Sequence, residues 1–170
     1  MFPKWKILLS IGVVFVIGAL ILIDAQMQLP SIPPRKSDVN LLFKYGVGER
    51  NELNTFNNSY TKDMIIDPPI TIGLYLSDAE MEQISQEMVA INFFNLSETF
   101  PLSEKLVMPS EGYYVRVQNG SMTKEVSWST NSELNSTTEN NLQQLANCIT
   151  GIVEKRPEYT RLPPPNGAYC

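Results

Sequence analysis

The chain has 170 residues, with 18 acidic and 13 basic side chains, a net charge of −5 and no histidine. Four of the basic residues and one of the acidic ones precede Asp38, so the part from Asp38 onward carries 9 basic and 17 acidic side chains, a net −8. This acidity argues against nucleic-acid binding, and because histidine is the commonest general base and metal ligand, we expect no metal and no cofactor.

The first predicted element is an apolar run of seventeen uncharged residues, which begins at Ile7 and ends at Ile23. As a helix rising about 1.5 Å per residue it spans roughly 25 Å, close to the ~30 Å hydrocarbon layer of a bilayer. Lys4 and Lys6 precede the run and Asp24 follows it, so the positive-inside rule keeps the N-terminus in the cytoplasm. We predict a single-pass anchor that contacts the lipid bilayer and holds the rest of the chain outside the cytoplasm. The alternative is a cleaved signal peptide, which would leave a secreted protein.

The anchor is predicted to occupy residues 1–25. Residues 26–37 contain three prolines and no periodic pattern, which indicates an extended spacer. Residues 38–156 are long enough for one folded domain with a single core. Residues 157–170 form a proline-rich tail.

Four strands are predicted in the first half of the domain, at residues 40–45, 52–56, 60–66 and 70–76. Apolar and polar side chains alternate in the first and the last of these, as they do in half-buried strands. Turn-forming residues at 57–59 join the second and third strands into a hairpin. The Asp-Pro-Pro segment at 67–69 is expected to end that hairpin.

Two helices and a second hairpin follow. Ser77 with Glu80 has the pattern of a capping box, and the helix it starts is expected to end near Asn92. Asn119-Gly120 predicts a type I′ turn, which would place Val117 opposite Met122 and Tyr113 opposite Val126. Ser136 with Glu139 predicts a second capping box. The apolar stripe of that helix is Leu142, Leu145, Ala146, Ile149 and Val153, and Pro157 is expected to end it.

The order of these elements contains no repeated parallel crossover. It predicts an α+β fold, an antiparallel sheet of about five to six strands with two helices packed on one face, preceded by the N-terminal transmembrane helix. The tail is expected to lack regular structure because of its prolines. Its three large side chains, Tyr159, Leu162 and Tyr169, predict that it docks on the domain.

Three segments of the chain resemble a family of small uncharacterised proteins of Bacillus-type bacteria. They read FKYGVGERNELNTFNNSYTKDMIIDPPIT, LSDAEMEQISQEMVAINFFN and RPEYTRLPPPNGAY, and the similarity extends over roughly residues 40–169. The family has no established activity. The resemblance therefore implies the compartment and the extent of the domain, and it assigns no catalytic residue.

The polar hairpin is the most site-like stretch, because its amides, hydroxyls and charges could hydrogen-bond a peptide or a glycan. The candidate ligand surface consists of Asn54, Asn57, Asn58, Thr61, Lys62 and Asp63. The alternative is a solvated face whose polar residues serve the turn.

The preferred function is a membrane-tethered, extracytoplasmic, non-catalytic binding or structural module, whose partner would be an envelope protein or a peptide. The competing hypothesis is a cell-envelope hydrolase that acts through Asp63, Asp67 or Lys62. The sequence leaves open the ligand, the oligomeric state and whether Cys148 and Cys170 form a disulfide.

Overall fold

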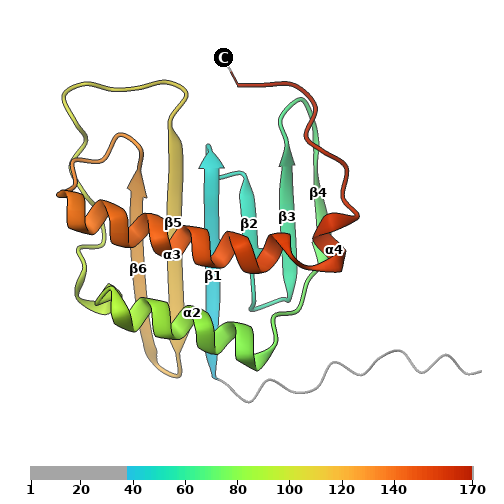
Figure 1. Cartoon of the computed structure of the whole chain (residues 1–170), viewed down its shortest axis with the longest axis horizontal. Coiled ribbons are helices and arrows are strands. Elements are labelled where there is room, and N and C mark those ends of the chain that lie inside the picture. Colours follow the sequence, from blue (N-terminus) through green and yellow to red (C-terminus); the bar gives the residue numbers. More distant parts are fainter. Residues whose placement is uncertain (1–37, 170) are drawn as a thin grey trace, which may run out of the picture. The chain divides into compact units, whose positions relative to one another are not determined.

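The computed structural model describes residues 38–169, so the predicted anchor, its cleavage and the spacer lie outside the described residues. The described chain is α+β, with six strands in one antiparallel sheet of order β4-β3-β2-β1-β5-β6 (Figure 1). The strands are β1 (Val39–Val47), β2 (Asn51–Asn54), β3 (Ser59–Met64), β4 (Asp67–Gly73), β5 (Glu111–Asn119) and β6 (Met122–Ser129). The helices are α2 (Asp78–Ala90), η1 (Phe93–Asn95), α3 (Ser136–Glu154) and α4 (Pro157–Thr160).

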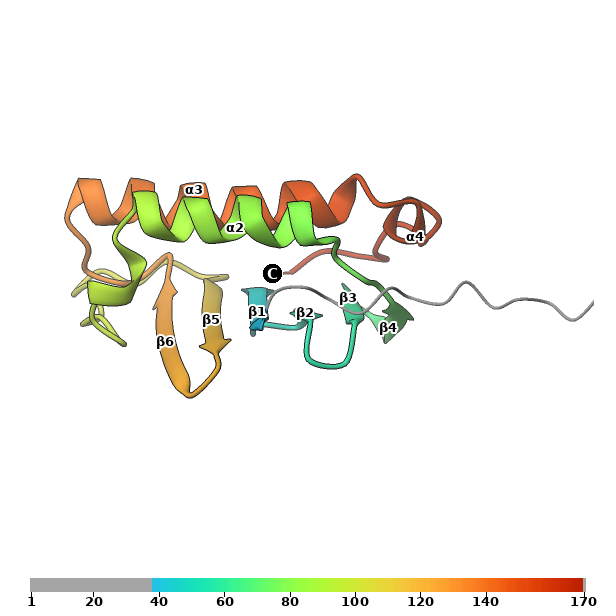
Figure 2. The same ribbon diagram turned by 90° about the horizontal axis from the view of Figure 1, so that it is seen from below.

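Both main helices cover the same face of the sheet. Figure 2 shows α2 and α3 side by side above the strands, with the other face left uncovered by the described elements. The predicted α+β class, with an antiparallel sheet and two helices, is therefore confirmed for residues 38–169.

The core lies between the helices and the sheet. β1 is a central strand between β2 and β5, and its Leu41 and Phe43 are fully buried. They face the apolar stripe of α3, whose five predicted residues are all buried: Leu142, Leu145, Ala146, Ile149 and Val153. The opposite face is polar and carries the ion pair between Lys44 and Glu52. This alternation along β1 decides which side chains point toward the helices.

The hairpin of β2 and β3 ends before Asp67 as predicted, but the expectation that the next strand begins only after the two prolines is wrong. β4 begins at Asp67, includes both prolines and ends at Gly73, so the predicted strand at 70–76 is shifted toward the N-terminus. The prolines are tolerated because β4 is an edge strand. In addition, its register against β3 shifts between Lys62 and Met64, so the ladder is already irregular there.

The Asn119-Gly120 hairpin forms, but its predicted register is wrong. Asn119 pairs with Met122, and Val117 therefore lies opposite Lys124. Among the four turn residues only Gly120 has a positive φ, of 57°, which is the pattern of a type II′ turn with glycine in the first central position. The type I′ turn assumed from the sequence would have centred the loop one residue earlier.

The two main helices begin and end by different means. The Ser77–Glu80 capping box of α2 is present as predicted. The box predicted at Ser136 and Glu139 is wrong, because Asn135 is the N-cap of α3 and accepts a hydrogen bond from the Thr138 amide at 2.9 Å. α3 ends at Glu154, before Pro157 as predicted, but Pro157 then begins the short helix α4, which corrects the expectation that the tail has no regular structure.

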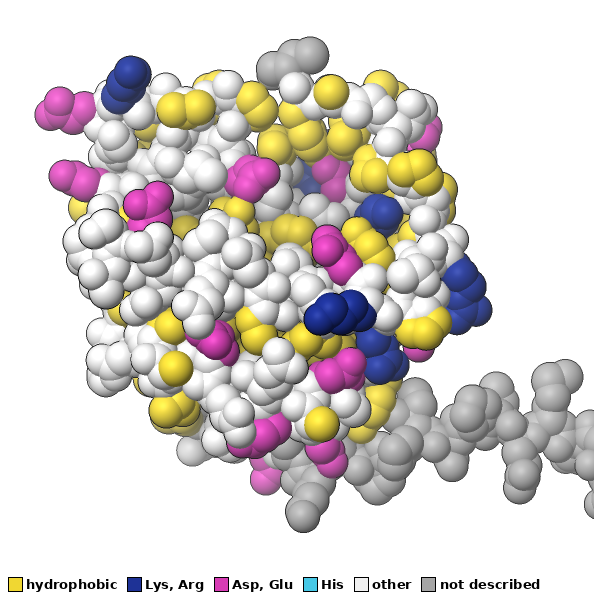
Figure 3. All heavy atoms as spheres, in the orientation of Figure 1, with side chains coloured by type: hydrophobic (Ala, Val, Ile, Leu, Met, Phe, Trp, Pro, Cys, Tyr) yellow, Lys and Arg dark blue, Asp and Glu magenta, His cyan; other side chains and the backbone are white. Residues whose placement is uncertain are grey.

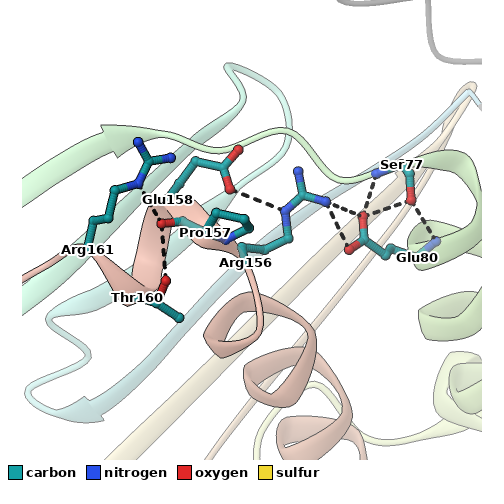
Figure 4. A network of polar contacts seen from close by, with 7 residues as sticks. All are labelled: Ser77, Glu80, Arg156, Pro157, Glu158, Thr160 and Arg161. Atoms are coloured by element: carbon teal, nitrogen blue, oxygen red, sulfur yellow. Dashed lines mark hydrogen bonds and ion pairs between the residues drawn. The ribbon is translucent and has the colours of Figure 1, made fainter.

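A polar network joins the end of α3 to the start of α2 (Figure 4). The Arg156 guanidinium lies 3.3 Å from the Glu80 carboxylate and 3.5 Å from that of Glu158. Glu80 also accepts hydrogen bonds from the Ser77 amide and hydroxyl, at 2.7 and 2.8 Å. The network holds the corner at which the chain leaves α3 and turns back toward the sheet.

Cys148 on α3 is a half-buried free thiol, and Cys170 lies outside the described residues.

Candidate functional site

A cavity of about 290 Å³ opens at the end of the sheet where β1 and β3 finish and β5 begins. Figure 3 shows it as a hollow with a basic and an acidic side chain inside and apolar side chains around it. We call it the tail cavity, because the C-terminal tail forms one of its walls. Its lining comprises Tyr45, Gly46, Val47, Asn51, Lys62, Asp63, Ile65, Glu111, Glu154, Tyr159, Pro165 and Tyr169.

Two neighbouring charged residues of β3 are buried at this cavity. Lys62 is 8% exposed, and its Nζ donates to the Pro163 carbonyl at 2.9 Å and lies 4.8 Å from the centre of the Tyr159 ring. Asp63 is 7% exposed, and it accepts hydrogen bonds from the Ile65 amide at 3.0 Å and from the Tyr169 hydroxyl. Both charges therefore take partners from the tail, and neither forms an ion pair within residues 38–169.

The tail is docked through its backbone as well. The Asn166 amide donates to the Met64 carbonyl at 3.2 Å, and the Asn166 carbonyl accepts from the Ile66 amide at 3.3 Å. Gly167 has φ of 96°, a conformation that favours glycine, and a Cβ there would lie 2.5 Å from Ile66 Cδ1. With Tyr159 and Leu162 packed against the core, the predicted docking of the tail is confirmed.

The backbone between β3 and β4 is strained where the tail meets it. Ile65 has φ of 66°, which is unfavourable for a β-branched residue and costs roughly 1–3 kcal/mol. Its amide is held by Asp63, and Ile65 forms a parallel bridge with Asn166. The contacts of Asp63 and the tail thus stabilise a conformation that the isolated hairpin would avoid.

Two tyrosines, the buried Tyr60 and the half-buried Tyr45, lie beside Lys62. The hydroxyls of Tyr45 and Tyr60 are 2.7 Å apart, and the Tyr60 ring meets the Tyr159 ring edge-on, with the ring centres 5.5 Å apart. Burial raises the pKa of Tyr45 to about 12. Burial also raises the pKa of Tyr60, and the proximity of Tyr45 adds to that shift. Both hydroxyls therefore stay protonated well above neutral pH.

The remaining charged groups of the lining are two exposed carboxylates, Glu111 and Glu154. Glu111 accepts a hydrogen bond from the Tyr113 hydroxyl at 2.7 Å. No basic side chain within residues 38–169 lies at ion-pair distance from either glutamate. The charged lining groups of the tail cavity are therefore three carboxylates and one ammonium.

The structure separates the six residues of the candidate ligand surface. Asn57 accepts from the Ser59 hydroxyl at 2.6 Å, and Asn54 accepts from the Phe56 amide at 3.1 Å. Both asparagines, with Asn58, lie at the turn between β2 and β3, at the end of β3 opposite to Asp63. Thr61 bonds the Thr71 hydroxyl. Of the six residues, only Lys62 and Asp63 line the tail cavity.

The residues of the hydrolase hypothesis are also divided. Asp67 pairs with Met64 at the exposed start of β4 and does not line the tail cavity, whereas Lys62 and Asp63 do. Sequence reasoning did not identify Tyr45, Glu111 or Glu154 as site residues. A signal for Tyr45 was present in the sequence, because the alternation of Leu41, Phe43 and Tyr45 places it on the helix-covered face of the sheet. The glutamates had no local signal.

The sequence matches no family model, and a search of curated proteins found no match. Within residues 38–169, no group of three or more cysteine, aspartate or glutamate side chains is placed to hold a metal ion. No helix in the same range is long and apolar enough to cross a membrane.

The raised pKa of Tyr45 predicts a loss of stability in alkali. Tyrosines of the unfolded chain release their protons near the ordinary pKa of 10.0, whereas folded Tyr45 holds its proton to about 12. The contribution of protonated Tyr45 to the free energy of unfolding should therefore be complete below pH 10 and decrease progressively between pH 10 and 12. Urea unfolding of Tyr45→Phe across this range should show a shallower decline than the wild type. Parallel curves for the two proteins would contradict the burial of this hydroxyl.

Proposed function

We propose that residues 38–169 form a non-catalytic binding module, tethered to the membrane by residues 7–23 and displayed outside the cytoplasm, with the tail cavity as its ligand site. The observation that carries the proposal is the cavity itself, in which two buried charges and several tyrosine side chains converge. Concave sites with apolar walls and a few fixed polar groups are typical of ligand binding.

The position of the cavity supports this proposal. The described chain begins near Val39 at one end of β1, and the cavity is lined by Tyr45, Gly46 and Val47 at the other end. Eight residue steps of a strand span roughly 26 Å. A ligand would therefore approach the domain from the side opposite to the attachment of the tether.

The contacts of Lys62 and Asp63 favour binding over hydrolysis. A general acid or base must reach the substrate with its polar atoms. Here the Lys62 ammonium is engaged by the Pro163 carbonyl, and both oxygens of Asp63 accept hydrogen bonds. Asp67, the third residue of the hydrolase hypothesis, does not line the cavity.

The tether is tested by the topology of the full-length chain in intact cells. Because Lys4 and Lys6 precede the apolar run, the domain is expected outside the cytoplasm. Protease added to intact protoplasts should digest the domain, while a cytoplasmic marker protein survives. A domain that is digested only after lysis would contradict the proposed orientation.

The ligand site is tested by blocking the cavity. Small amines, carboxylates and short peptides are screened against the full-length chain by NMR, with the tyrosine rings labelled. Compounds that bind should shift the signals of Tyr45, Tyr159 and Tyr169. Val47→Trp places a large side chain in the cavity, so it should weaken the binding of these compounds at least about tenfold, a loss of roughly 1.4 kcal/mol of binding free energy.

The matched control for this variant is Val89→Trp. Val89 is 71% exposed on α2 and does not line the cavity, so this substitution should leave the affinity unchanged. Equal affinities for both variants, or a screen in which no compound shifts the cavity tyrosines, would contradict the proposed site.

A further inference from the structure

We infer that the tail cavity is selective for a small organic cation, an alkylammonium or guanidinium compound, held by Glu111 and Glu154 against the tyrosine rings. The inference rests on the proposed function and adds the chemical class of the ligand.

The charges of the lining support a cationic ligand. Lys62 is the single basic residue among the lining groups, and its ammonium is already bonded to Pro163 and placed over the Tyr159 ring. Asp63 takes its hydrogen bonds from an amide and a hydroxyl, neither of which cancels its charge. Glu111 and Glu154 have no basic partner within the described residues. The Arg50 guanidinium lies beside Tyr169, so the charges at the cavity are three negative and two positive. The balance still favours a cation over an anion.

The rings of the lining support the same class. The face of an aromatic ring attracts a cation through its quadrupole. Two tyrosine rings of the lining already make cation–π contacts within the protein. The Lys62 ammonium lies 4.8 Å from the Tyr159 centroid, and the Arg50 guanidinium lies 5.9 Å from the Tyr169 centroid. Arg50 itself is not a lining residue. Carboxylates beside tyrosines therefore offer an ammonium group both an ion pair and a ring face.

The size of the cavity limits the ligand. A volume of about 290 Å³ is at the lower end of the range for small-molecule sites, roughly 300–1,000 Å³. An alkyl chain of a few carbons with a charged end group fits this space. Such a chain could lie along Val47 and Pro165, two apolar residues of the lining.

Three five-carbon probes that differ in their end groups test the inference on the full-length chain. They are 1,5-diaminopentane, 1,5-pentanediol and glutarate, and binding is followed through the NMR signals of the tyrosine rings. The diamine should shift the signals of Tyr45, Tyr159 and Tyr169. It should leave Tyr114 unaffected, because that residue follows the buried Tyr113 and so points to the opposite face of the sheet. The diol and glutarate should bind at least about tenfold more weakly.

Charge-removing variants identify the groups that hold the cation. Glu154→Gln and Glu111→Gln should each lower the affinity for the diamine roughly threefold, as expected for exposed ion pairs, and the double variant should lower this affinity further. Glu104→Gln is the matched control, because Glu104 is an exposed loop glutamate outside the lining. This variant should bind the diamine with the same affinity as the wild type.

Several outcomes would overturn the inference. If glutarate or the diol binds the cavity as tightly as the diamine, the site is a binding site of another chemical class, and the proposed function stands. Diamine binding that is unchanged by both glutamine substitutions would place the cation elsewhere. If none of the three probes binds, the cation class is wrong, and the proposed function is then decided by the Val47→Trp screen alone.

Discussion

The burial of Lys62 and Asp63 is the constraint on which the C-terminal part of the structure depends. Both side chains are less than a tenth exposed, and a buried charge without hydrogen-bonding partners costs several kcal/mol. Each has a partner from the tail, 101 and 106 residues further along the chain: the Pro163 carbonyl for Lys62 and the Tyr169 hydroxyl for Asp63. The tail is thus an integral part of the domain, and in covering these charges it also forms a wall of the cavity.

The rest of the fold delivers the tail to this position. Alternation along β1 and β3 directs Tyr45, Tyr60 and Lys62 toward the helices. The contact of Arg156 with Glu80 fixes the corner after α3, so that the following residues return over the end of β3. The positive φ of Ile65 is held there by Asp63 and Asn166. Strain that persists because its surroundings hold it is common at binding sites, and here it coincides with the proposed one.

The sequence predicted the fold well, because strand alternation, the Ser77 capping box and the apolar stripe of α3 are local signals. It also predicted the docking of the tail from its large side chains. The hairpin register was missed because Asn119-Gly120 can occupy either of two positions in a two-residue loop, and local sequence does not choose between them. The site was predicted only in part. Lys62 and Asp63 were identified, but the asparagines near them in sequence lie at the other end of β3, roughly 13–20 Å away. Glu111 and Glu154 reach the cavity only through tertiary structure.

A double-mutant cycle between Asp63 and Tyr169 tests the central claim most directly. The free energies of unfolding of the wild type, Asp63→Ala, Tyr169→Phe and the double variant give the coupling energy between the two side chains. The account predicts a coupling of about 1 kcal/mol or more, as expected for a hydrogen bond to a charged group. As a control, Asp63→Ala is combined with Tyr114→Phe, on the opposite face of the sheet, and their changes in the free energy of unfolding should be additive. A coupling near zero for Asp63 and Tyr169 would contradict the claim that the tail satisfies the buried charge.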